Sequence, residues 1–210
     1  MYMKMNQEFS ILRDAPLLQG VLIYEDYSFR FEPSDWRQVG KIEGERGYGY
    51  FRLYDLEIHF GIETGRLLYP TGYSPVLDQH RGHLPDISSI QGGIQILAFP
   101  KIESDQAIEF GEDIIWNRIY DADKGQVCIF RDDIRFPESE DYYIEFASGV
   151  ILGLREKMMT SLWLTPLEWI DRDPEIVSRP ICTTSLIRYL RRLAFIYKRF
   201  QALSTRFFED

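Results

Sequence analysis

The fold is decided by the stretch Leu56-Glu57-Ile58-His59-Phe60-Gly61-Ile62-Glu63-Thr64-Gly65-Arg66-Leu67-Leu68-Tyr69. Apolar and polar side chains alternate over its first five residues, and a period of two is typical of a strand with one face in the core. A short polar turn with Gly65 follows, and glycine reaches the positive φ of tight turns at low cost. Apolar residues then resume, so the stretch predicts an antiparallel hairpin.

The same design recurs along the chain. Two further hairpins are predicted, with turns at Gly125 and Gly149: Ile114 to Tyr120 with Val127 to Phe130, and Tyr143 to Phe146 with Val150 to Leu154. Alternation in Tyr27, Phe29 and Phe31 sends three rings to one face of another strand. Shorter strands are expected at Val21–Tyr24, Ile94–Phe99 and Ser161–Leu164. Gly40 to Gly49 is interpreted as a flexible connection, and Pro70 to Pro85 as a long loop.

The C-terminal part of the chain has a different pattern. Apolar residues at spacings of three, four or seven predict an amphipathic helix over about 184–207, after a proline-containing linker at 171–182. The stripe consists of Leu186, Leu190, Leu193, Tyr197, Phe200 and Phe207. We expect an α+β, mainly β, single domain over 1–210. Its antiparallel body at about 18–170 is barrel-like or two-layered, and the C-terminal helix packs on it or forms a homodimer.

Charge is distributed unevenly. The net charge is −9; Met1 to Cys182 holds 18 Lys+Arg against 31 Asp+Glu (18 − 31 = −13), and Thr183 to Asp210 holds 6 against 2 (6 − 2 = +4). An acidic body argues against nucleic acid as a direct ligand, which leaves a basic protein partner or no electrostatically recognised partner at all. The two cysteines, Cys128 and Cys182, form no metal-binding or disulfide pattern. No leader or membrane segment is apparent, so a cytoplasmic protein is expected.

Histidine positions offer two candidate sites. Asp55, Glu57 and His59 stand at i, i+2 and i+4, so on a strand they point to one face, where they are able to hold a metal or share a proton. The same pattern is also that of an ordinary solvated strand face. His80 and His83 lie in the long loop and are interpreted as exposed loop histidines, because two ligands alone make a weak metal site.

An acidic tract with tyrosines is the predicted partner-binding surface. Carboxylates steer the approach of a basic protein, and aromatic rings supply contact area in an interface. The predicted residues are Asp132, Asp133, Glu138, Glu140, Asp141, Tyr142 and Tyr143. The alternative interpretation is an ordinary solvated loop between hairpins.

Sequence motifs of common enzymes are missing: there is no nucleophile elbow, phosphate loop, His-Glu-x-x-His or dinucleotide fingerprint. We therefore expect a non-catalytic module without cofactor or metal, of the kind that immunity proteins and antitoxins represent when they block a basic nuclease toxin. The alternative is a small-ligand-binding barrel whose wall carries Trp116, Tyr120 and Phe130. An enzyme that uses Asp55, Glu57 and His59 is a third hypothesis.

Overall fold

A computed structural model describes residues 7–53, 55–75, 81–98, 101–109, 114–133 and 141–170. The chain divides into two compact units, Met1–Arg172 and Asp173–Asp210, and the fold below is that of the first. The predicted linker at 171–182 and the predicted helix at about 184–207 lie outside the described residues. Both therefore stay predictions. Within the described part, no helix is long and apolar enough to cross a membrane.

The first unit is mainly β, as predicted, and most of its strands belong to two sheets. The seven-stranded sheet has the order β15 (Glu168–Ile170), β2 (Gly20–Glu25), β3 (Ser28–Pro33), β6 (Leu67–Tyr73), β5 (Leu56–Gly61), β4 (Tyr48–Leu53) and β9 (Ala107–Glu109). The six-stranded sheet has the order β10 (Trp116–Asp121), β11 (Gln126–Arg131), β14 (Met158–Leu164), β13 (Val150–Arg155), β12 (Tyr142–Ala147) and β7 (Ser89–Gln91). A small third sheet pairs β1 (Phe9–Leu12) with β8 (Gly93–Ile96).

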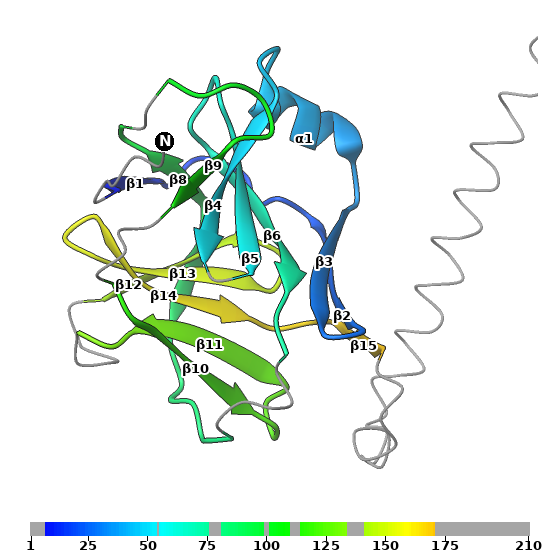
Figure 1. Cartoon of the computed structure of the whole chain (residues 1–210), viewed down its shortest axis with the longest axis vertical. Coiled ribbons are helices and arrows are strands. Elements are labelled where there is room, and N and C mark those ends of the chain that lie inside the picture. Colours follow the sequence, from blue (N-terminus) through cyan, green and yellow to red (C-terminus); the bar gives the residue numbers. More distant parts are fainter. Residues whose placement is uncertain are drawn as a thin grey trace, which may run out of the picture. The chain divides into compact units, whose positions relative to one another are not determined.

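One hydrophobic core joins the two large sheets. The largest cluster of buried side chains includes Phe51 and Phe60 of the seven-stranded sheet together with Phe146 and Leu162 of the six-stranded sheet. Phe9 of β1 adds an edge-on contact to the ring of Phe51, with 6.0 Å between centroids. In Figure 1 the strands β4, β5 and β6 run steeply across β12, β13 and β14. The body is thus two layers that share their inner faces.

A second, smaller cluster lies on the other face of the six-stranded sheet. It consists of Leu84, Cys128, Tyr143 and Trp163. Cys128 stands between Val127 and Ile129, which belong to the large cluster, because successive strand residues point to opposite faces. The segment that contributes Leu84 covers this outer face, and it becomes important for the sites below.

The three predicted hairpins are confirmed. β5 pairs antiparallel with β6, β10 with β11, and β12 with β13. The glycines in their turns, Gly65, Gly125 and Gly149, have φ of +66°, +60° and +76°. A side chain is strained at such angles, so these turns favour glycine.

Four expectations need correction. The connection at Gly40 to Gly49 contains part of a helix, α1 (Trp36–Glu43), which begins at the cap Asp35 and buries Val39 and Ile42. The long loop starts later than expected, because β6 continues to Tyr73. Among the described strands neither large sheet closes into a barrel, and three edge pairings are parallel: β15 with β2, β9 with β4, and β7 with β12.

Tyr27 also departs from the predicted strand. Asp26 and Tyr27 have φ of +47° and +64°, so they form the turn between β2 and β3. The Tyr27 side chain is exposed, whereas Phe29 and Phe31 point into the core as expected.

Candidate functional site

The described part of the acidic tract lies at one end of the six-stranded sheet. Asp132 and Asp133 follow the last residue of β11, while Asp141 precedes β12. Strands β14 and β13 separate β11 from β12, and each neighbouring pair is antiparallel. The last residue of β11 and the first residue of β12 therefore lie at the same end of the sheet. Glu138 and Glu140 lie outside the described residues.

Two carboxylates of the tract have arginine partners within the chain. Asp133 receives two hydrogen bonds from Arg131, at 2.9 Å from Nε and 2.5 Å from Nη2, and these lower the pKa of the Asp133 carboxyl. Asp141 receives one from Nε of Arg155 at 2.8 Å, and its own side chain is fully buried. Asp141 is therefore a structural residue of the sheet end, not a surface charge.

The two tyrosines of the tract point in opposite directions. Tyr143 is buried, packs edge-on against Trp163 at 5.9 Å, and donates a hydrogen bond to Oδ2 of Asp141 at 3.3 Å. Burial, with the nearby Asp141 carboxylate, raises the pKa of the Tyr143 hydroxyl. Tyr142 is 58% exposed. Adjacent strand residues alternate between the two faces, so only one of the pair is available to a partner.

Sequence reasoning missed an apolar neighbour of this tract. Ile115, just before β10, is 62% exposed, and its carbonyl accepts a hydrogen bond from the backbone N–H of Asp132 at 2.8 Å. Asn117 donates to Oδ1 of Asp132 at 2.6 Å. We call the group Ile115, Asp132, Asp133 and Tyr142 the acidic end. Four strand spacings separate β10 from β12, so the group spans roughly 19 Å.

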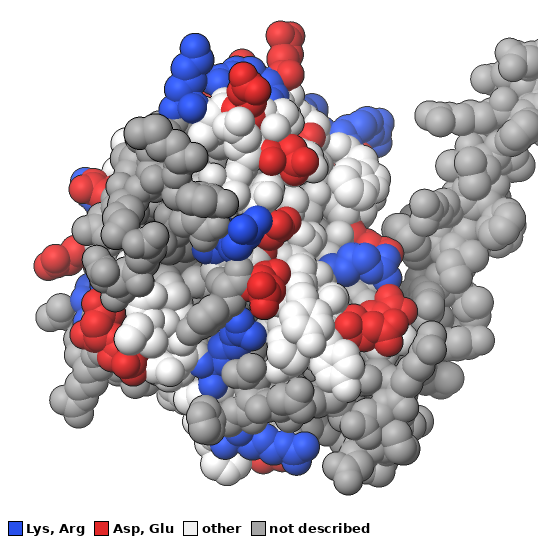
Figure 2. Space-filling view, viewed as in Figure 1, with Lys and Arg blue, Asp and Glu red and all other residues white. Residues whose placement is uncertain are grey.

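The charges of the body are mixed on the face that Figure 2 shows. Lys and Arg side chains there lie beside Asp and Glu side chains in small groups. The net charge of the chain therefore does not appear on this face as a continuous acidic field. A partner that recognises charge needs a local arrangement such as the acidic end.

The second predicted site is only partly assembled. Glu57 and His59 share the outer face of β5, with 3.8 Å between Oε2 of Glu57 and Nε2 of His59. Nε2 of His59 also lies 2.9 Å from Oγ1 of Thr71. Asp55 belongs to the turn before β5 and is exposed, and it does not come together with Glu57 and His59 as a group of three possible metal ligands. The proposed three-ligand arrangement is not formed.

Aromatic rings surround His59 instead. The imidazole centroid lies 5.0 Å from Tyr48, 5.8 Å from Tyr50 and 5.3 Å from Tyr69. Burial lowers the pKa of His59 to about 4, so the imidazole is neutral at neutral pH. The tyrosines come from β4 and β6, the neighbours of β5. Tyr48 and Tyr50 stand two residues apart, and this spacing was the sequence signal for rings on one face of the strand beside His59.

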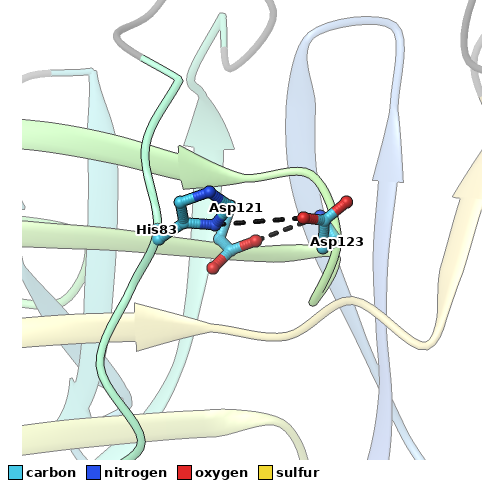
Figure 3. Close-up of side chains that lie close together, drawn as sticks. All are labelled: His83, Asp121 and Asp123. Carbon is cyan, nitrogen blue, oxygen red and sulfur yellow. Dashed lines mark hydrogen bonds and ion pairs between the residues drawn. The ribbon is translucent and has the colours of Figure 1, made fainter.

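A third group of side chains forms where the segment 81–86 meets the turn between β10 and β11. His83, Asp121 and Asp123 each offer one ligand atom, and these atoms all lie within 4.8 Å of one another. Figure 3 shows the imidazole and the two carboxylates together, with 3.9 Å between Nδ1 of His83 and Oδ2 of Asp123. His83 is thus close to Asp121 and Asp123, which lie far from it in the sequence. His80 lies outside the described residues.

Asp121 organises this group. It is buried, and its carboxylate accepts backbone hydrogen bonds from Leu84 at 2.8 Å, Asp123 at 3.0 Å and Lys124 at 3.2 Å. Burial alone would raise the pKa of Asp121, but these three N–H groups together hold it below its usual value. The carboxylate therefore ties the covering segment to the turn.

The rings expected on a ligand-binding wall are divided between two faces. Trp116 and Tyr120 belong to the large core cluster, whereas Phe130 packs against the small cluster on the outer face of the six-stranded sheet. They do not line one common wall. Compared with known protein families and with curated proteins, the chain matches none of them.

Proposed function

We propose that this chain is a non-catalytic binding protein whose acidic end receives a basic partner protein. The observation that carries the proposal is the exposure of Tyr142 and Ile115 at the same end of the sheet as Asp132 and Asp133. An exposed ring and an exposed aliphatic side chain at the same sheet end as carboxylates combine anchors with charge recognition, and tyrosine is enriched among the residues that dominate interface energetics.

A cationic enzyme is the class of partner that fits best. Proteins that act on nucleic acid carry positive sites for phosphates, and an acidic module is able to occupy such a site. Association of this kind is fast and weakens with salt. We therefore propose an inhibitor of the immunity or antitoxin type, whose target is a nuclease toxin.

The first experiment uses the full chain as bait in a lysate of its source and identifies basic proteins that it retains. Association of the purified partner is then measured at about 50 and 300 mM salt. We expect the association rate to fall at least tenfold at the higher salt, since charges steer the encounter. A rate that is insensitive to salt would remove the electrostatic reason for the proposal.

Variants of the two carboxylates and the tyrosine separate their roles. Tyr142→Ala should weaken binding at least tenfold, mainly through faster dissociation, and Asp132→Asn with Asp133→Asn should mainly slow association. Tyr73→Ala is the matched control, because Tyr73 is a 49% exposed tyrosine on the other large sheet. Equal losses for Tyr142→Ala and Tyr73→Ala would show that the acidic end is not the contact surface.

A further inference from the structure

The backbone on both sides of His83 is held against the end of β10. The N–H of Gly82 donates to the carbonyl of Tyr120 at 3.1 Å, and the N–H of Leu84 donates to Oδ2 of Asp121 at 2.8 Å. A side chain loses less conformational freedom on binding an ion or a partner when the backbone on both sides of it is already held in place. His83 is thus presented to the β10–β11 turn by a preorganised segment.

Three donors of two chemical types converge there. Nδ1 of His83 comes from the covering segment, while the carboxylates of Asp121 and Asp123 come from the turn; His83 and Asp123 are exposed and Asp121 is buried. A carboxylate has about four acceptor positions, and three of those on Asp121 are filled by backbone N–H groups. One position remains on Oδ2, so Asp121 is able to serve as a fixed, monodentate ligand.

We propose that His83, Asp121 and Asp123 bind a divalent transition metal ion of the zinc type. Zinc takes imidazole nitrogen and carboxylate oxygen at about 2.0 Å in tetrahedral geometry, which places ligand atoms about 3.3 Å apart. The exposed side chains of His83 and Asp123 reach that separation from their present 3.9 Å by rotation. A water molecule completes the fourth position.

The donor set selects among metals. Calcium takes six to eight oxygen ligands and magnesium keeps near-ideal octahedral oxygen coordination, so an imidazole with two carboxylates suits neither well. Imidazole favours zinc, copper, nickel and iron. We therefore expect binding of Zn²⁺ without measurable binding of Mg²⁺ at the same concentration.

Lys124, the cation that follows Asp123, is already engaged elsewhere. Nζ of Lys124 donates to the carbonyl of Leu84 and to Oδ1 of Asp86, each at 2.6 Å, which directs the ammonium toward the 84–86 side of the segment. A bound metal would add a further tie between the segment and the turn, next to Leu84, which packs with Cys128 and Trp163. Its role is therefore structural.

Titration calorimetry of the full chain with zinc chloride tests the site. We expect one equivalent of Zn²⁺ to bind, and binding to weaken at least tenfold in His83→Ala and in Asp123→Asn. Both side chains are exposed, so these variants should keep the fold, which their circular dichroism spectra verify. Asp121 is not substituted, because its carboxylate holds the turn itself.

Two controls stay close to the site. His80→Ala removes the other histidine of the same loop, and Asp86→Asn removes an exposed carboxylate of the same segment. Both should bind Zn²⁺ like the unmodified chain. The proposal is overturned if the unmodified chain binds no Zn²⁺, or if His83→Ala and Asp123→Asn bind it unchanged. It is also overturned if the two control variants lose binding as strongly as the two site variants do.

This test is independent of the proposed partner. The metal site lies at the Asp121 end of β10, and the acidic end lies at the Trp116 end of the same strand. Variants that lose zinc binding therefore leave the partner surface unchanged, and variants that lose partner binding leave the metal site unchanged.

Discussion

His59 makes the stability of the protein depend on pH in a defined window. Its pKa is lowered to about 4 in the folded chain from 6.5 in an unfolded one, chiefly by burial. Below pH 6.5 the unfolded chain binds the proton first, so the free energy of unfolding falls as the pH drops toward 4 and then levels off. The full effect is about 3 kcal/mol. Urea unfolding across this pH range measures it.

The variant His59→Gln isolates this effect. Glutamine keeps a hydrogen-bonding group near Thr71 but does not titrate, so the fall between pH 6.5 and 4 should be smaller by about 3 kcal/mol. Burial raises the pKa of Glu57 and of Glu43, which stabilises the folded state at low pH, but both groups are present in both proteins and cancel in the difference. Identical pH profiles would show that His59 is not buried.

Asp141 and Asp133 should differ in their contribution to stability, although both pair with arginine. Asp141 is fully buried beside Arg155, so Asp141→Ala should reduce the free energy of unfolding by about 3 kcal/mol. Asp133 is 56% exposed, so Asp133→Ala should cost less than about 1 kcal/mol. Urea unfolding at pH 7 compares the two. Equal costs would contradict the difference in burial.

The sequence predicted which residues carry charge and rings but not which of them are exposed. Asp141, Tyr142 and Tyr143 are consecutive, yet only Tyr142 is exposed, because a sheet has two faces and the covered one is known only from the fold. The group of His83, Asp121 and Asp123 was out of reach for a related reason. Only the spacing of the two aspartates is local, and His83 joins them through the parallel bridge between Arg81 and Tyr120.

Among the elements, the segment 81–86 acts as a cover for the outer face of the six-stranded sheet. Leu84 packs in the small cluster with Cys128, whose side chain is completely buried. Leu84→Ala should therefore speed the reaction of Cys128 with a thiol reagent at least tenfold, because a large-to-small change of about 2 kcal/mol or more lowers the free energy of local opening. The measurement uses a Cys182→Ser background, which leaves one thiol.

The control for the cover is Ile90→Ala. Ile90 lies on the edge strand β7 of the same sheet and is 45% exposed, so its removal should leave the labelling rate of Cys128 unchanged. If both variants accelerate labelling equally, the thiol becomes accessible by general unfolding and the segment is not a separate cover.

The sequence predicted strands better than it predicted helix α1 and the turn at Asp26. Each hairpin needed only local alternation and one glycine at positive φ. Helix α1 is short and holds Gly40 in its middle; its signal was the cap Asp35 followed by apolar positions 36, 39 and 42. The turn at Asp26 and Tyr27 places two non-glycine residues at positive φ, against their ordinary preference, so local propensity points away from it.

At the scale of the whole described body, the two-layer alternative was right, and the described strands form no closed barrel. The sheet edges distinguish the two arrangements, because β15, β9 and β7 end their sheets there, each paired in parallel with a strand far away in the chain. Parallel neighbours need long connections, and nothing local in the sequence specifies which strand a short edge segment joins. The layers themselves follow from alternation, because each sheet must bury its apolar face.

One shared core implies that the two large sheets unfold together. Phe51 belongs to β4 and is 1% exposed, in the cluster that also holds Phe146 and Leu162 of the other sheet. Phe51→Ala should lower the free energy of unfolding by about 3 to 5 kcal/mol. Hydrogen exchange measured by mass spectrometry should then accelerate by the same factor in peptides from β4–β6 and in peptides from β12–β14, because both open in one cooperative step. Ile115→Ala is the control, since Ile115 is 62% exposed and its removal should leave both rates unchanged. Acceleration confined to β4–β6 would mean that the sheets are separate cooperative units, and that the packing between them contributes less to stability than the pairing within each.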